Sequence, residues 1–507
     1  MKTRSFILAS ALFLSLAALQ AQAPGAPDSS FAVNGRFLDD ALGNVEDDYA
    51  TDAAVLPGGK IMLVGTAVTG NSPDIVLVRL NADGTRDNSF GNSGASAIDL
   101  SLGGSDYGER ILVQPDGKML ICGAAPGPND ADIFVIRLNE DGSFDESFGT
   151  GGSILLDFGG DDAGIAMALG ENGRIIVGGT SQNGMQSIVI AALTSAGVAD
   201  NGFSADGMEV IDGGGSSLAL FEMVTGSDGD IFFCGSTEPN TAIVGKVLAN
   251  GGLDNTFAGD GILEYQHFGE NSILMDIVAG QNGEIWAAGG YLSQVGAAGF
   301  IIKLNADGTP DQAFDTDGAN EYFFQAGQET LLFTDMALTS DGILCGGALA
   351  NRYLTVMFDF ADGGLSNSYG TGGFADNESN ASFTTALQRM INLDADRVLM
   401  VGYYMPSTTD MVAMALNARN PQTVSVQNIV SLAPGIFPNP ATESFRLDIP
   451  GGATVQSVEV YNIAGQRIHT FSGNQQQYAI PAGMQPGTYI LNIHTENGIN
   501  SARIIIK

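Results

Sequence analysis

The chain has 507 residues, more than one ordinary hydrophobic core contains, so several domains or a repeat array are expected. Hydrophobic residues make up 44% of it, which is enough for packed cores and excludes wholesale disorder. The formal net charge is −37, from 57 acidic and 20 basic residues, and such a surface repels nucleic-acid phosphates and anionic membranes. Nucleic acid is therefore not an expected partner.

Residues 1–23 are typical of a secretory signal peptide. A basic start is followed by an apolar stretch from Phe6 to Leu19, and small residues stand at Ala21 and Ala23. The stretch is too short and too near the start of the chain to be a membrane anchor. No other apolar run approaches the length that spans a bilayer, so the sequence predicts export and no transmembrane segment.

One short phrase recurs along residues 24–417, for example as "DNSFGNSG" and "DESFGTGG". Its aromatic residue returns every 54 to 59 residues, with a glycine six residues before it and another four residues after it. The aromatic positions are Phe31, Phe90, Phe148, Phe203, Phe257, Phe314 and Tyr369. Glycine accepts a positive φ, and the aspartate three residues before the aromatic in six copies can bind nearby amides. The phrase therefore predicts a fixed turn whose aromatic side chain fills the space between neighbouring units.

Four short apolar runs separate successive copies of the phrase. Turn sequences such as "PDGK" and "QNGE" join the second run to the third and are strong hairpin signals. Four strands in a unit of about 56 residues are typical of a β-propeller blade. The first phrase has no strand before it, and the last strand, residues 411–417, has no phrase after it. We therefore expect an all-β, seven-bladed propeller over residues 24–417, in which the N-terminal segment completes the seventh blade.

Three cysteines, Cys122, Cys234 and Cys345, are 112 and 111 residues apart, and each precedes a glycine in an apolar run. An odd, small number is no disulfide framework. The spacing predicts one buried structural position in alternate units, too far apart for a bridge.

The chain changes character after the repeats. Residues 418–435 have the composition of a linker, and residues 436–507 contain short runs of alternating apolar and polar residues, such as "SFRLDI". Alternation of this kind predicts half-buried antiparallel strands. Six or seven strands in about 72 residues predict a small, Ig-like β-sandwich.

Two resemblances bear on family. The motif "LNADGTRDNSFGNSG", followed later by "DGKMLICG", resembles the delta-60 repeat of bacterial secreted and surface proteins, which implies a propeller-like fold and no defined activity. The C-terminal features "FPNP" (437–440), "VYNIAGQRI" (460–468), "PGTYIL" (486–491) and a terminal lysine resemble the C-terminal sorting domain of type IX secretion cargo in Bacteroidota. This second resemblance implies that the secretion machinery is a partner and that the protein is released outside the cell or attached to its surface. An ordinary sandwich adhesion module is the alternative.

No catalytic residue is predicted. Of the three histidines only His267 lies in the propeller region, and "EYQHFGE" contains no nucleophile elbow. Cysteine and histidine are not spaced as zinc ligands, and no glycine-rich stretch has the lysine and helix of a phosphate loop. Paired carboxylates remain open as an enzymatic alternative, because glycoside hydrolysis needs only two, correctly separated in space.

Calcium is the one cofactor that the sequence leaves open. Asp206, Asp260 and Asp317 occupy one position of the repeat, and Asp315 lies close to Asp317. Oxygen-rich loops suit calcium, although the spacing is not that of an EF-hand and turn aspartates are the alternative. These four residues are the candidate metal ligands.

The function predicted from the sequence is a secreted or cell-surface propeller that binds or scaffolds an unidentified protein or glycan. The alternative is a propeller-based glycan-active enzyme. Two carboxylates about 5–10 Å apart in one concave pocket would favour the enzyme.

Overall fold

A computed structural model of the chain describes most of its residues. The described residues are 22–43, 47–70, 72–100, 104–280, 283–293, 296–315, 317–322, 331–349, 352–378, 384–405, 409–419, 435–437, 441–448, 454–462, 467–473, 475, 477–481, 484–495 and 498–507. Nearly all of the predicted signal peptide and most of the predicted linker lie outside them. The chain divides into two compact units, Met1–Gln422 and Thr423–Lys507, so the division falls inside the predicted linker.

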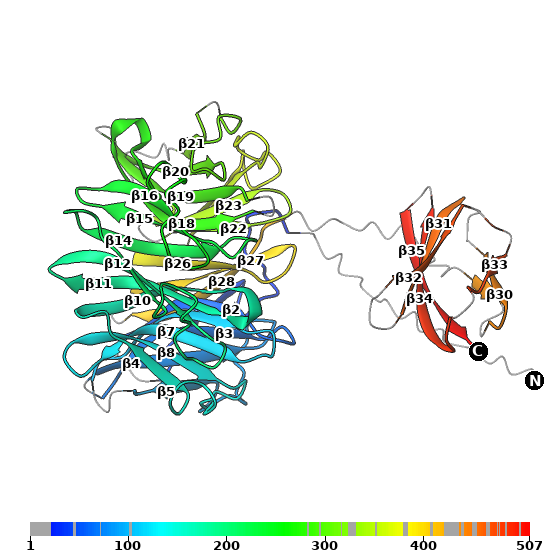
Figure 1. The fold of residues 1–507 in the computed structure, drawn as a ribbon, viewed down its shortest axis with the longest axis horizontal. Helices are drawn as coiled ribbons and strands as arrows, with labels where there is room; N and C mark the ends of the chain where they lie inside the picture. The colour runs from blue at the N-terminus through cyan, green and yellow to red at the C-terminus, as the bar shows by residue number, and fades with distance from the viewer. Residues whose placement is uncertain are drawn as a thin grey trace, which may run out of the picture. The chain divides into compact units, whose positions relative to one another are not determined.

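Seven four-stranded antiparallel sheets make up the described part of the first unit (Figure 1). Sheet 1 is β2 (Asp48–Val55), β3 (Ile61–Thr69), β4 (Ser72–Leu80) and β5 (Ala95–Ile98); sheet 2 is β6 (Tyr107–Val113), β7 (Met119–Pro126), β8 (Ala131–Leu138) and β9 (Ser153–Leu156); sheet 3 is β10 (Asp161–Leu169), β11 (Ile175–Asn183), β12 (Met185–Leu193) and β13 (Met208–Ile211). Sheet 4 is β14 (Leu218–Thr225), β15 (Ile231–Thr237), β16 (Thr241–Val247) and β17 (Ile262–Tyr265); sheet 5 is β18 (Asn271–Ala279), β19 (Ile285–Ser293), β20 (Gly296–Leu304) and β21 (Ala319–Tyr322). Sheet 6 is β22 (Asp335–Leu338), β23 (Ile343–Leu349), β24 (Arg352–Phe358) and β25 (Phe374–Glu378); sheet 7 is β26 (Thr384–Asn392), β27 (Arg397–Met405), β28 (Asp410–Asn417) and β1 (Arg36–Asp39). Two short 3-10 turns, η1 (Glu171–Gly173) and η2 (His267–Gly269), precede β11 and β18.

The seven sheets form a closed ring. The first strand of each sheet contacts the first strand of the next, from β2 through β6, β10, β14, β18 and β22 to β26, and β26 contacts β2 again. Figure 1 shows the yellow strands of sheet 7 beside the blue strands of sheet 1. The N-terminal strand β1 pairs antiparallel with β28, with Arg36 opposite Met414 and Asp39 opposite Met411. The predicted all-β propeller is confirmed, and the N-terminal segment completes its last sheet.

The recurring aromatic residues pack between neighbouring sheets, as the turn phrase predicts. Phe90 is buried, and a Cβ added to Gly142 of the next unit would lie 2.8 Å from the Phe90 ring. The last aromatic, Tyr369, meets the first glycine, Gly25, in the same way, at 3.2 Å. Glycine is required at these positions because a side chain would displace the ring and because φ is positive, +87° at Gly142.

The aspartate of the phrase fixes the turn and ties neighbouring units together. Asp87 accepts hydrogen bonds from the backbone and hydroxyl of Ser89 and binds Lys60 and Arg79, both at 2.7 Å. Arg79 also donates to the carbonyl of Glu140 in the next unit at 2.9 Å. These contacts give a local reason for the recurrence of the phrase.

The cysteines occupy two positions, not one. Cys122 and Cys234 stand one residue before a glycine that faces a backbone carbonyl of the first strand of its sheet. Cys345 stands two residues before the equivalent glycine of sheet 6, and the carbonyl that this glycine faces lies before the first strand. The equivalent glycine in sheet 6 is Gly347, where a Cβ would lie 2.1 Å from the Leu332 carbonyl oxygen. Close approach to that carbonyl sets the register and moves Cys345 by one residue to the other face of β23. All three thiols are buried and free, as expected.

The C-terminal unit is also built of strands. β29 (Gly435–Phe437), β30 (Ser444–Asp448) and β33 (Tyr478–Ala479) form one sheet; β32 (Arg467–Ser472), β31 (Val455–Asn462), β34 (Gly487–Thr495) and β35 (Gly498–Ile506) form the other. Phe445 and Tyr478 of the first sheet share a core with Val458 and Leu491 of the second. Two packed sheets agree with the predicted sandwich; the Ig-like type stays a prediction. Among the described residues of the chain, no helix has the length and apolar character to cross a membrane.

Candidate functional site

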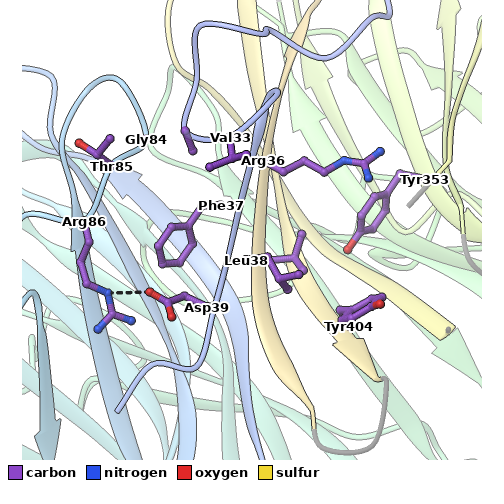
Figure 2. A pocket seen from close by; sticks show the side chains of 12 residues that line it. Val33, Arg36, Phe37, Leu38, Asp39, Gly84, Thr85, Arg86, Tyr353 and Tyr404 are labelled. Atoms are coloured by element: carbon purple, nitrogen blue, oxygen red, sulfur yellow. Dashed lines mark ion pairs between the residues drawn. The ribbon is translucent and has the colours of Figure 1, made fainter. Parts of the chain in front are cut away.

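A groove surrounds the closing strand β1. It has a volume of 640 Å³ and is lined by Ala32, Val33, Arg36, Phe37, Leu38, Asp39, Gly84, Thr85, Arg86, Tyr353, Tyr404 and Val412 (Figure 2). On one side of β1, Phe37 and Asp39 lie toward Arg86 of sheet 1; on the other side, Leu38 lies toward Tyr353 and Tyr404. The groove exists because the N-terminal segment enters the ring here as the outermost strand of sheet 7.

Aliphatic side chains form the exposed wall of the groove. Val33 is 75% exposed and Leu38 is 52% exposed, whereas Phe37 and Tyr353 are buried beneath them. The charged groups bind within the protein, since Arg86 pairs with Asp39 at 3.1 Å and donates to two backbone carbonyls. Exposed apolar side chains grouped in one groove are typical of a binding surface.

A related groove lies between sheets 2 and 3. It has a volume of 570 Å³, and its lining includes Leu155 and Val198, which are both exposed. Leu155 occupies the same position in sheet 2 as Leu38 does in sheet 7. Leu155 lies opposite Phe134, Leu38 lies opposite Val412, and Phe134 and Val412 are equivalent residues of the third strand. The groove around β1 differs from it in its arginines, in Asp39 and in the two tyrosines.

Charged side chains from six first strands meet inside the ring. They share one register, because each lies opposite the second-strand residue that directly precedes the glycine facing a backbone carbonyl. We call these residues the first-strand charge cluster: Asp52, Arg110, Glu222, Asp276, Asp335 and Arg389. Arg389 binds a Glu222 carboxylate oxygen, lies 3.1 Å from Asp335 and 3.8 Å from Asp276, and its Nε lies 3.6 Å from Asp52. One guanidinium of sheet 7 therefore connects sheets 1, 4, 5 and 6.

The carboxylates of this cluster have different proton affinities. Burial raises the pKa of Glu222, but Arg389 and Arg110 outweigh burial and hold that pKa below its usual range. Burial raises the pKa of Asp276 to about 6 in spite of Arg389, and it raises the pKa of Asp335 well above its usual value. Glu222, Asp276 and Arg389 also line a cavity of 290 Å³. Two carboxylates with separated pKa values in one cavity are what acid–base chemistry requires.

The oxygens of these two carboxylates are already used. Both Asp276 oxygens accept backbone amides, from Ile277 at 2.9 Å and from Met336 of the next sheet at 2.8 Å. Glu222 accepts the Met223 amide with one oxygen and the two arginines with the other. These bonds hold neighbouring sheets together, so the geometry fits a structural role better than catalysis.

The sequence-predicted metal ligands lie in exposed turns. Asp206, Asp260 and Asp317 each accept the backbone amide two residues further on, at 3.0–3.2 Å. Asp315 is exposed and has a positive φ of 43°. None of the four belongs to the acidic groups that the described residues bring close together. The turn role is visible in the structure, and metal binding at these residues stays a prediction.

His267 is buried in a wall of aromatic rings. Its Nδ1 is 3.0 Å from the Tyr265 hydroxyl, and its ring stacks on Phe300. Burial lowers its pKa, although Glu321 lies 3.4 Å from Nε2, so the ring is neutral at pH 7. Its surroundings are those of a packed core residue.

Two family models match parts of the chain. Residues 435–507 match a secretion system C-terminal sorting domain. Residues 56–90 and 114–148 match a domain of unknown function (DUF5122) described as a β-propeller. The chain is a β-propeller protein with a type IX secretion sorting domain. It is therefore exported, to the exterior of the cell or its outer surface, and its C-terminal domain engages the secretion machinery.

Several solved structures are similar to this exported propeller at low sequence identity. A protein of unknown function from Dyadobacter fermentans is 14% identical, with 76% of this chain and 100% of that chain covered and a TM-score of 0.41. The polysaccharide lyase Uly1 is 9% identical, with 79% and 98% covered and a TM-score of 0.44. Sqt1 from Chaetomium thermophilum, bound to the N-terminus of a ribosomal protein, is 10% identical, with 75% and 98% covered and a TM-score of 0.44. No curated protein matches the chain.

The groove and the charge cluster of this propeller were not found from the sequence. The cluster has a sequence signal, because "DYATDAAV" and "DYGERILV" align Asp52 with Arg110. The groove has none, because Tyr353 and Leu38 come from opposite ends of the repeat region and only ring closure brings them together.

Proposed function

We propose that this exported propeller is a binding module, and that its ligand is an extended polypeptide segment held in the groove around β1. The observation that carries the proposal is the exposure of Val33 and Leu38 on an outermost strand, above a floor that includes Phe37 and Tyr353. An outermost strand offers backbone groups along its open edge, and apolar pockets beside it accept alternate side chains of an added strand.

A polypeptide fits the groove better than a glycan. A sugar presents many hydroxyl groups, each of which needs a polar partner when it leaves water. The exposed wall is aliphatic, and Arg86 and Asp39 bind one another. Apolar side chains would gain from burial against Val33 and Leu38 without leaving polar groups unpaired.

The enzymatic alternative rests on the separated pKa values of Glu222 and Asp276 in the 290 Å³ cavity. It is the weaker candidate, because the oxygens of both carboxylates hold amides or arginines. A polysaccharide panel incubated with the purified protein tests it: product that vanishes in a Glu222→Gln variant of native stability would establish it.

The binding proposal is tested with a phage-displayed peptide library selected on the purified protein. Selected peptides should carry alternating apolar residues, and Leu38→Asp should weaken their binding by about tenfold or more, since a charge would enter an apolar contact. Val210→Asp is the matched control, because Val210 is also 52% exposed and has the register of Leu38 in sheet 3. Equal losses in the two variants, or binding on a glycan array that Leu38→Asp abolishes, would contradict the proposal.

A further inference from the structure

Two junctions between sheets each carry a cluster of three carboxylates. At the junction of sheets 1 and 2, Asp74, Asp99 and Asp106 each place one carboxylate oxygen within 4.8 Å of the others. At the junction of sheets 2 and 3, Asp130, Asp132 and Asp157 do the same. Asp74 and Asp132 share one register, opposite Ala67 and Ala125, and Asp99 and Asp157 both follow the outermost strand of their sheet. Two of the three positions therefore recur at both junctions, whereas the third carboxylate differs: Asp106 lies just before β6 in the first cluster, and Asp130 lies just before β8 in the second.

A buried carboxylate at each junction lacks a partner. Asp74 is 4% exposed and Asp132 is 1% exposed. The Oδ1 atoms of both are buried and have no hydrogen-bond partner among the residues described. Burial and the neighbouring carboxylates raise the pKa of each to about 6. A buried oxygen without a partner, beside two further carboxylates, is costly unless a positive charge compensates it.

Another junction shows that the fold does not need these acids. Between sheets 4 and 5, the places of Asp74 and Asp99 are held by Thr241 and Gln266, which form a hydrogen bond at 3.3 Å. The place of Asp106 is held by Ser272.

One backbone contact of Asp106 survives the change to serine. Asp106 accepts the Leu100 amide at 2.7 Å, and Ser272 accepts the His267 amide at 2.9 Å. A hydroxyl thus suffices for the contact, and a neutral pair fills the remaining space. The carboxylates at the first two junctions therefore need an explanation other than folding.

We propose that each of these two junctions binds one calcium ion, held by Asp74, Asp99 and Asp106 at the first and by Asp130, Asp132 and Asp157 at the second. The donors are all carboxylate oxygens, which suit a hard cation such as calcium and not the softer metals that prefer nitrogen or sulfur. Calcium sites of extracellular modules work at about 10⁻⁴–10⁻³ M, a range that suits an exported protein. The first ion would link the outer part of sheet 1 to the start of sheet 2, and the second would link the start of β8 to the segment that follows β9.

The number of bound ions tests the proposal directly. Isothermal titration of chelator-treated protein with calcium chloride should give two ions per chain. Asp74→Asn and Asp132→Asn should each leave one site, and the double variant none. Asp260→Asn, in an exposed turn, is the matched control and should keep both. The proposal is overturned if the wild-type protein binds no calcium up to about 10 mM, if the double variant still binds two ions, or if Asp260→Asn removes them.

Thermal unfolding separates a lost site from a damaged fold. Without calcium, the double variant should melt at or above the temperature of the wild-type protein, because neutral amides relieve the repulsion. With calcium, only the wild-type protein should gain several degrees, since a ligand of the folded state stabilises it by mass action. An equal gain in both proteins would overturn the proposal, as would a gain given by magnesium but not by calcium.

Discussion

Arg397 of sheet 7 forms an ion pair with Asp28 at 3.0 Å, although 369 positions separate the two residues. Lys60 and Lys118 make the same kind of contact with Asp87 and Asp145 inside their own units. The final unit therefore obtains its aspartate from the start of the chain. Closure of the ring also positions β1, and with it the groove.

The packing of the aromatic residues predicts a large difference between two glycines of similar φ. Gly142→Ala should cost about 1–3 kcal/mol beyond backbone strain, because its Cβ would lie 2.8 Å from Phe90. Gly184→Ala should cost only the strain of a positive φ, about 1–2 kcal/mol, since nothing lies within 4 Å. Urea unfolding of the two variants measures both values, and equal losses would argue against the aromatic contact.

The charge cluster predicts that Arg389→Met destabilises the protein strongly near neutral pH. Removing the guanidinium leaves buried carboxylates uncompensated, so the loss should be about 3–5 kcal/mol at pH 7. The loss should shrink at pH 5, because Asp276 and Asp335, whose pKa values are already raised, can take up protons. Arg419→Met, on the surface, should change stability by less than about 1 kcal/mol. Unfolding curves of the wild-type protein and the Arg389→Met variant at both pH values measure this loss of stability. A loss of stability that is the same at pH 5 and pH 7 would contradict the role of these carboxylates.

The two carboxylate junctions predict a pH dependence in calcium-free buffer. Asp74 and Asp132 have a folded-state pKa of about 6, above the usual value for aspartate, so the folded state binds more protons between pH 4 and pH 6. Stability should therefore fall as pH rises through this interval and stay low above it.

The groups that face these carboxyls are Asp99 and Asp106 in the first junction and Asp130, Asp157 and Asp162 in the second. The Asp74→Asn, Asp132→Asn double variant should lose this component of the pH dependence. The measurement is the difference in melting temperature between the wild-type protein and the double variant, taken at several pH values from 4 to 7. A constant difference across the range would contradict the raised pKa values.

The ring could be predicted from the sequence because its signals are local. Gly142 and Asp87 act on their own turn or on the adjoining unit, so their recurrence carries the architecture. The position of Cys345 could not be obtained in this way, since a one-residue shift of register depends on the carbonyl of Leu332, which lies three residues before the partner strand β22.

The sites were less predictable for a related reason. Exposure of Leu38 and burial of Tyr353 follow from closure and not from the residues themselves. The junction carboxylates did leave a signal, because "DIVLVRLN" and "DIFVIRLN" begin with Asp74 and Asp132. An aspartate at the start of a buried strand is indistinguishable in sequence from a turn residue until its neighbours from two other strands are known.

The pairing of β1 with β28 is tested most directly by a disulfide. Leu38 and Val412 lie opposite each other, so Leu38→Cys with Val412→Cys should form a cross-link on mild oxidation. Mass spectrometry of a proteolytic digest should show the two ends of the propeller joined. Leu38→Cys with Val189→Cys, which places the second thiol at the same register in sheet 3, should not cross-link. A folded double variant that stays reduced at residues 38 and 412, or a cross-link to residue 189, would contradict closure of the ring by the N-terminal strand.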